Sequence, residues 1–190
     1  MFRELVLANR SYRRFAQNES IDEAALRELI DLARCCPSAA NLQPLRYVIS
    51  CSPDRNATVF ETLAWAGYLA DWPGPEEGER PSAYIVILAD TGISKTPAHD
   101  VGIAAQTILL GAAEKGLGGC MFGSINRDLL RKSLNIPDCY EIALVIALGK
   151  PVEKVVLEGV GPDGSIKYYR DPDGVHHVPK RALDDLILQV

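Results

Sequence analysis

Two stretches of the chain are apolar at every position and predict strands that are covered on both faces. The first runs over residues 83–89 (AYIVILA) and the second over residues 142–148 (IALVIAL). Continuous apolar runs of this length are typical of strands in the middle of a sheet. A shorter β-rich run spans residues 46–50 and follows a proline-containing loop. Together these runs predict a sheet whose central strands are buried.

Apolar residues at helical spacing predict helices around these strands. Ser20 and Glu23 fit a capping box, and the apolar stripe behind them predicts a helix that ends near Cys35. The same kind of spacing predicts further helices over residues 59–70 and 126–134. The order along the chain is therefore a mixture of helices and strands without a visible repeat.

The most apolar helix is predicted over residues 96–116. Thr96 provides a cap, Pro97 suits the first turn, and Gly116 follows Lys115 where a helix usually ends. The body of this helix has small or apolar side chains on nearly every face, so it must be covered all round. We expect it to lie both at the centre of the monomer and in a large interface with a second copy.

Composition is consistent with one α+β domain over residues 1–190. Lys and Arg number 20 against 25 Asp and Glu, so a net charge of −5 leaves no basic surplus for nucleic acid. The longest apolar stretch is interrupted by Gln106 and is too short for a membrane span, which takes about 20 residues. Five cysteines, an odd number, and the absence of a signal-peptide pattern predict a cytoplasmic protein.

Clustered cations near both ends of the chain are the first candidates for chemistry. Residues 10–14 contain three guanidinium groups and a hydroxyl, from Arg10, Ser11, Arg13 and Arg14. A bound phosphate ester would relieve their repulsion, because guanidinium forks match phosphate oxygens. The pair Lys180 and Arg181 could complete such a site. Solvated surface charge is the alternative interpretation of both segments.

Two loops could bring backbone close to a ligand. In residues 37–44 the side chains are small, and Asn41 and Gln43 carry amides that can bind the edge of a ring. Gly123 and Ser124 precede a helix, where free N–H groups could meet an acceptor atom. The alternatives are an ordinary helix-to-strand connection for residues 37–44 and a simple helix cap for Gly123 and Ser124. The glycines of residues 116–124 lack the spacing of a dinucleotide fingerprint.

Taken in order, these segments resemble the nitroreductase family. Its Arg-Ser-x-Arg-x-Phe motif is matched by Arg10, Ser11, Arg13 and Phe15, and its Pro-Ser-x-x-Asn-x-Gln-Pro loop is matched by Pro37, Ser38, Asn41, Gln43 and Pro44. The match continues through residues 100–102, 116–118 and 147–151 to Lys180 and Arg181, and so covers nearly the whole chain.

The resemblance implies an α+β fold with a mostly antiparallel central sheet surrounded by helices. It also implies an intertwined homodimer that holds FMN between its subunits and uses NADH or NADPH to reduce a small organic acceptor in a ping-pong cycle. The implied contacts to the phosphate, ribityl chain or pyrimidine edge are Arg10, Ser11, Arg13, Lys180 and Arg181. Those along another side of the flavin are Pro37, Ser38, Ala39, Asn41 and Gln43, with the backbone of Gly123 and Ser124 near flavin N5.

The chain departs from the family at two places. Asn9 stands where many relatives have a basic residue, and residues 63–69 supply neither the lysine nor the asparagine that reaches the flavin in some relatives. The aromatic residues Trp65, Tyr68, Trp72, Tyr168 and Tyr169 suggest instead an aromatic access region, with the turn-rich residues 72–81 as a lid.

These departures keep other functions open. The acceptor could be a nitroaromatic, a quinone or another small molecule, and the alternatives are flavin storage, flavin destruction, reductive dehalogenation or a dimeric interaction module without cofactor. We predict no metal site and assign no catalytic acid or base. His99, His176 and His177 are expected to be structural or on the surface, and Cys120 to be buried and inert.

Overall fold

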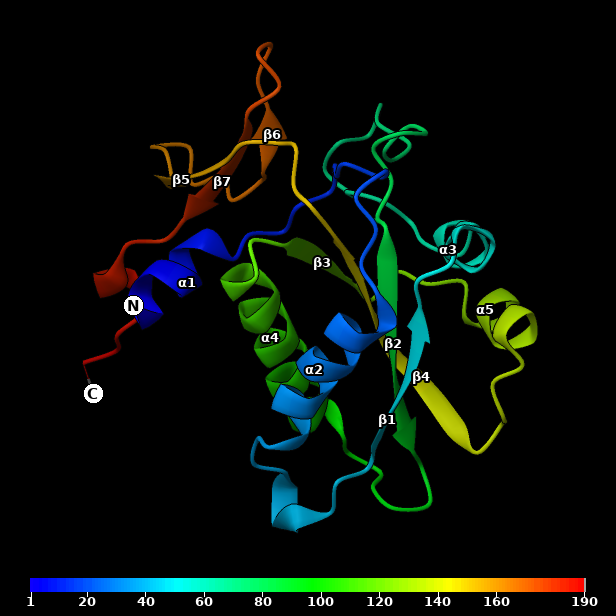
Figure 1. Cartoon of the computed structure of the whole chain (residues 1–190). Coiled ribbons are helices and arrows are strands. Elements are labelled where there is room, and N and C mark those ends of the chain that lie inside the picture. The colour runs from blue at the N-terminus through cyan, green and yellow to red at the C-terminus, as the bar shows by residue number, and fades with distance from the viewer. Residues whose placement is uncertain (190) are drawn as a thin grey trace.

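A computed structural model describes residues 1–189 and shows an α+β fold built on a four-stranded antiparallel sheet (Figure 1). The strand order is β1-β2-β4-β3. The bounds are β1 (Leu45–Ser50), β2 (Ala83–Asp90), β3 (Gly118–Phe122) and β4 (Tyr140–Gly149). The predicted fold class and the two predicted central strands are confirmed, because β2 and β4 lie side by side in the middle of the sheet.

Helices cover both faces of this sheet, and the alternation of side chains along β2 determines which residues meet them. Ile85 and Ile87 face the cluster that contains α2 (Glu23–Arg34) and α4 (Ala98–Glu114). Tyr84 and Val86 face the cluster that contains α3 (Pro53–Phe60) and α5 (Arg127–Leu134). Residues 83–89 are all buried, as a strand between two helical layers requires.

Two predicted helix starts are wrong, and one predicted helix lies elsewhere. Asp22, rather than Ser20, caps α2 by accepting a bond from the Ala25 N–H at 2.7 Å. Pro97, rather than Thr96, occupies the cap position of α4. The helix expected over residues 59–70 lies earlier in the chain, because Ser52 and the first-turn proline Pro53 start α3 there. It ends at Phe60, after which the chain turns. The start of α5 at Asn126 is confirmed.

Helix α4 is the largest helix against the sheet, yet it is not covered all round within one chain. Ala104, Ala105 and Ile108 are buried, and Gly111 lets Leu29 of α2 approach closely. On the opposite side Gly102 and Gln106 are exposed and Ile103 is 40% exposed. The predicted burial at the centre of the monomer is therefore confirmed, and a second copy covering the rest stays a prediction.

A small second sheet follows β4 and was not foreseen from the sequence. It contains β5 (Val155–Gly159), β6 (Tyr169–Arg170) and β7 (His176–Lys180) in the order β5-β7-β6, with β5 and β7 parallel. Helix α1 (Phe2–Ala8) and two short 3-10 turns, η1 (Ala39–Asn41) and η2 (Leu183–Asp185), complete the structure (Figure 1). Lys180 is the last residue of β7. None of the helices within residues 1–189 is long and apolar enough to cross a membrane.

The close approach of β3 to α4 gives a test of this packing. A Cβ atom at Gly119 would overlap the carbonyl oxygen of Ala147 and lie 2.6 Å from Leu109 Cδ2. We expect Gly119→Ala to lower the free energy of unfolding by about 1–3 kcal/mol, as overpacking does. Urea denaturation measures the change. Gly159→Ala is the control because its Cβ meets nothing within 4 Å, and equal losses in both variants would contradict the packing.

Candidate functional site

The site begins with the N-terminal arm, residues 9–17, which runs in an extended form against the sheet. The Tyr12 N–H donates to the Gly119 carbonyl of β3 at 3.0 Å, and the Phe15 N–H donates to the Glu79 carbonyl at 2.9 Å. The ring of Phe15 is fully buried and lies on Gly149, where any side chain would displace it. These contacts fix the backbone from which the arm's arginines project.

The arm forms one wall of a cavity of about 350 Å³, which we call the basic cavity. It lies between the arm, α4, β3 and the small sheet. The arm, α4 and β3 contribute Asn9, Arg10, Ser11, Arg13, Gln106, Leu109 and Met121. The small sheet, together with the residue just before β6, contributes Val155, Tyr168, His176, Val178 and Lys180. This lining includes three cations, Arg10, Arg13 and Lys180, and no carboxylate.

Arg13 is buried, with 8% of its surface exposed, and its guanidinium has only neutral partners. Its Nη1 donates to the Ser11 carbonyl at 3.3 Å and to His176 Nε2 at 3.2 Å. The guanidinium carbon lies 4.8 Å from the centre of the Tyr168 ring, in a cation–π contact. Nε of Arg13 is buried without a partner within residues 1–189, as is Nε of Arg10.

The nearest buried carboxylate, Glu153, is occupied elsewhere. Its Oε1 accepts bonds from the backbone N–H groups of Arg13 and Arg14, the latter at 3.2 Å. Its Oε2 lies 2.9 Å from Arg170 Nη2. Because only 1% of the Glu153 side chain is exposed, this group joins the arm to the small sheet in a low-dielectric place.

The two adjacent histidines of β7 face opposite sides of the strand, as the alternation of strand side chains requires. His176 points inward, where burial and the nearby guanidinium groups of Arg13 and Arg170 lower its pKa to about 4. His177 lies 3.0 Å from carboxylate oxygens of both Glu158 and Asp171, and hydrogen bonds to Asp171 first and Glu158 second raise its pKa. His176 is therefore neutral near pH 7.

Sequence reasoning did not select His176 as a site residue. It expected the three histidines to be structural or on the surface, whereas His176 lines the basic cavity. The signal that could have found it is its alternation with His177 once β7 is known to be a strand. Tyr168 was expected in an aromatic access region, and it packs between Tyr68 at 4.9 Å and His176 at 5.2 Å, measured between ring centres.

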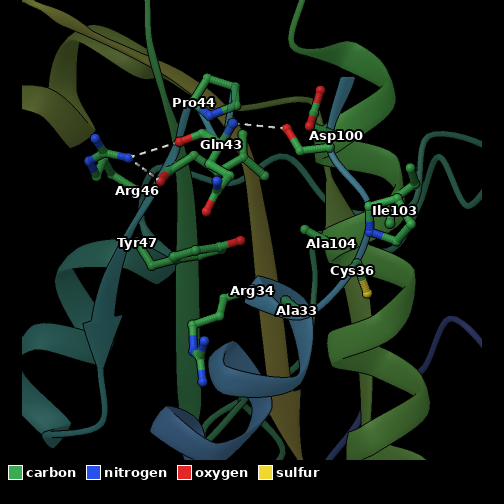
Figure 2. Close-up of a pocket in the computed structure, with 13 residues that line it drawn as sticks. Ala33, Arg34, Cys36, Gln43, Pro44, Arg46, Tyr47, Asp100, Ile103 and Ala104 are labelled. Atoms are coloured by element: carbon green, nitrogen blue, oxygen red, sulfur yellow. Dashed lines mark hydrogen bonds between the residues drawn. The ribbon is translucent and has the colours of Figure 1, made fainter. Parts of the chain in front are cut away.

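The second predicted loop forms a separate cavity of about 170 Å³, which we call the loop cavity. Figure 2 shows Gln43 and Tyr47 on one side of it and Ile103 and Ala104 of α4 on the other. The Gln43 N–H donates to Ser38 Oγ at 2.9 Å, which closes the loop on itself. Pro37, Ser38 and Gln43 line this cavity, and no residue lines both cavities.

The backbone of this loop is held in an uncommon conformation. Ala40, Asn41 and Gln43 have φ values of 48°, 56° and 51°, in the left-handed region that favours glycine. The Ala39 N–H donates to Asp100 Oδ1 of α4 at 3.3 Å, so the helix helps to hold the loop. Strained backbone of this kind is often found at ligand-binding sites.

The structure thus brings together only part of the predicted site. The basic cavity collects Arg10, Ser11, Arg13 and Lys180, and the loop cavity collects Pro37, Ser38 and Gln43. The predicted residues that line neither cavity are Ala39, Asn41, Gly123, Ser124 and Arg181. Cys120 is 4% exposed, which confirms its predicted burial. Within residues 1–189 no cluster of His, Cys, Asp or Glu could hold a metal ion.

Comparison with known proteins identifies the family to which this chain belongs. A model of the nitroreductase family matches residues 6–150, and the chain therefore belongs to that family of oxidoreductases. A protein of Methanothermobacter thermautotrophicus, provisionally named NADH dehydrogenase/NAD(P)H nitroreductase, is 26% identical over 180 residues. That alignment covers 91% of this chain and 84% of the relative.

Solved structures show the same fold. A nitroreductase family protein of Streptococcus pneumoniae aligns with a TM-score of 0.73 at 18% identity, over 100% of both chains. A provisionally assigned nitroreductase of Exiguobacterium sibiricum, solved in complex with FMN, aligns with a TM-score of 0.64 at 20% identity. That alignment covers 80% of this chain and 89% of the other.

The buried Glu153 gives a test of how the arm is held. Glu153→Gln removes the charge that faces Arg170 and weakens the bonds from the arm backbone. We expect the free energy of unfolding to fall by about 3 kcal/mol, as when one partner of a buried ion pair is lost. Urea denaturation measures it. The control is Glu23→Gln, which breaks an exposed pair with Arg27 and should cost at most about 0.5 kcal/mol. Similar losses would refute the role of Glu153.

The histidine on the outer face of β7 predicts a pH dependence of stability. Because the pKa of His177 is raised above 6.5 in the folded chain, its contribution is complete below that pH and is lost as pH rises through the folded pKa. His177→Gln should therefore destabilise the protein more at about pH 6 than at about pH 9. Urea midpoints at both pH values measure this. The exposed His99 serves as control through His99→Gln, and a pH-independent effect of His177→Gln would contradict the expectation.

Proposed function

We propose that this chain is a single-domain, cytoplasmic FMN-dependent oxidoreductase that uses NADH or NADPH to reduce a small organic acceptor. The observation that carries the proposal is the basic cavity, which gathers three cations and no carboxylate in a protein of net charge −5. A cavity of this kind favours an anionic ligand. The FMN complex of the Exiguobacterium sibiricum protein, which shares the fold, supports FMN as that ligand.

The residues of the basic cavity fit the charged parts of FMN. Arg10, Ser11 and Lys180 would bind the phosphate, for which a guanidinium, a hydroxyl and an ammonium are suitable donors. Arg181 would add a charge from just outside the cavity. Arg13, deeper in the protein, would face the pyrimidine edge and stabilise negative charge near N1 and O2. The unpartnered Nε atoms of Arg10 and Arg13 support a ligand with acceptor atoms here.

A homodimer would supply the remaining contacts. The loop residues Pro37, Ser38, Ala39, Asn41 and Gln43 would reach the flavin from the partner, with backbone N–H groups of Gly123 and Ser124 near its reacting end. Support comes from the exposed face of α4, where Gly102, Ile103 and Gln106 are uncovered. Ile103 lines the loop cavity and Gln106 lines the basic cavity, so a partner on this face would contact both. Obligate dimers typically bury large apolar interfaces.

Bound FMN supplies two-electron transfer between the nicotinamide and the acceptor, in two half-reactions at one site. The residues of the chain would bind the flavin, orient it and place positive charge beside it. Arg13 is fixed by its neutral partners and presents a positive charge, and Tyr168 and Met121 provide cavity walls of low polarity. We assign no proton donor or acceptor among the side chains.

Storage of flavin by a flavin-binding protein without this turnover is the second candidate function. It is favoured by residues 61–70, which form turns and contain neither the lysine nor the asparagine that some relatives direct at the flavin. The two candidates share the binding site and differ in whether NADH or NADPH reduces the bound flavin.

One experiment separates these functions. Purified protein is mixed with FMN, excess FMN is removed, and absorbance is followed anaerobically as NADH or NADPH is added. We expect retained FMN whose absorbance near its visible maximum bleaches with one or both donors. Retained FMN without bleaching would favour the second function. A protein that retains no FMN would refute both.

The basic cavity itself is tested by Arg10→Ala. Loss of a charge-assisted bond to phosphate should raise the FMN dissociation constant by about tenfold or more. Quenching of FMN fluorescence measures this constant. Arg27→Ala, on the exposed face of α2, is the matched control and should leave it unchanged. An unchanged constant for Arg10→Ala would leave the arm's cations as surface charge.

A further inference from the structure

Arg13 is the buried one of the three cations that line the basic cavity, and no carboxylate within residues 1–189 forms an ion pair with its guanidinium. Its Nη1 contacts a carbonyl oxygen at 3.3 Å and an imidazole nitrogen at 3.2 Å, and an aromatic ring lies across its face. Buried arginines are usually paired with carboxylates, because an unpaired charge in a low-dielectric place is costly. The choice of neutral partners at this position therefore needs an explanation.

A carboxylate stands close to this part of the arm but is directed away from the guanidinium. Glu153 contacts the backbone of Arg13 and Arg14 with one oxygen and the side chain of Arg170 with the other. Both oxygens are thus committed to other donors. The charge of Arg13 therefore remains available to the cavity that its side chain lines. Among the described residues, the side chain that accepts a hydrogen bond from its guanidinium is His176.

The protonation of His176 is fixed by its surroundings. Burial and two guanidinium groups lower its pKa to about 4, so the ring is neutral at physiological pH. Because Nε2 accepts from Arg13, the proton of the neutral ring lies on Nδ1. Nδ1 is buried and has no partner within residues 1–189, so Arg13 makes the one polar contact of this ring.

We propose that His176 is a positioning residue that orients the Arg13 guanidinium through a neutral acceptor and so leaves the full positive charge available to the bound cofactor. This inference rests on the proposed binding of FMN. A carboxylate at position 176 would orient Arg13 as well, but it would cancel the charge that stabilises the pyrimidine edge. Reduced flavin carries more negative charge there than oxidised flavin, so the neutral acceptor favours the reduced form.

The neighbouring His177 has carboxylate partners, in contrast to His176 on the same strand. It is flanked by Glu158 and Asp171 at 3.0 Å each, and it stacks on Tyr169 with ring centres 4.7 Å apart. Adjacent residues of β7 therefore hold a ring among cations on the inner face and a ring among anions on the outer face. Only the inner one contacts the candidate site.

The test uses three variants of the full chain loaded with FMN. His176→Gln keeps a neutral acceptor, His176→Leu removes the acceptor at similar size, and His176→Glu adds a negative charge at the same length as Gln. The FMN dissociation constant and the two-electron midpoint potential of the bound flavin are measured for each. His177→Gln is the control, since its side chain lies on the other face of β7.

We expect His176→Gln to remain close to wild type in both quantities. His176→Leu should raise the FMN dissociation constant by about tenfold, since Arg13 loses a bond to a charged donor. His176→Glu should shift the midpoint potential to a more negative value than His176→Gln does, and His177→Gln should change neither quantity. A purely space-filling role for His176 would not separate Gln from Leu in the FMN dissociation constant.

Equal potentials for the Gln and Glu variants would overturn the inference while leaving FMN binding intact. Equal dissociation constants for Gln and Leu would show that the acceptor does not position Arg13. If the Glu variant does not fold, the comparison of Gln with Leu still decides whether the acceptor matters. Wild-type protein that binds no FMN would instead overturn the proposed function, and this inference with it.

Discussion

The arrangement of the site depends on one buried carboxylate. Glu153 binds two consecutive backbone N–H groups of the arm and the Arg170 guanidinium of the small sheet, so it connects the two walls of the basic cavity. Its negative charge is used for structure and is kept away from the cavity lining. The protein thereby concentrates positive charge in one place although its total charge is negative. A carboxylate free to turn toward Arg13 would undo this separation.

Helix α4 links the rest of the fold to both cavities. Its buried side packs on the sheet. The helix also contributes Gln106 and Leu109 to the basic cavity and Ile103 and Ala104 to the loop cavity. A side chain at position 111 would displace the ends of the Leu29 and Leu32 side chains of α2. Core packing and site geometry are therefore coupled through one helix. A substitution in the core that moves α4 would change the geometry of both cavities.

Part of this picture could be predicted from the sequence and part could not. The continuous apolar runs of β2 and β4 predicted their strands because few other environments accept such segments. The helix predicted over residues 59–70 was wrong, since Trp65 packs on Phe122 from a turn and so imitates a helical stripe. Strands as short as β6 and β7 are too short to show an alternation of apolar and polar residues. The inward direction of His176 follows only once β7 is known to be a strand. The left-handed backbone at Ala40 is invisible in sequence because alanine does not favour it.

The contact between Arg13 of the arm and His176 of β7 has a consequence for the order of events during synthesis. Arg13 and His176 are 163 residues apart, and ribosomes add about 5–20 residues per second, so the arm waits roughly ten to thirty seconds for its partner. Glu153 also emerges long after the arm that it holds. The arm is therefore synthesised long before the strand that completes the basic cavity, and the cavity forms only after β7 has been made. A ligand of the basic cavity can in consequence bind only after β7 has been synthesised.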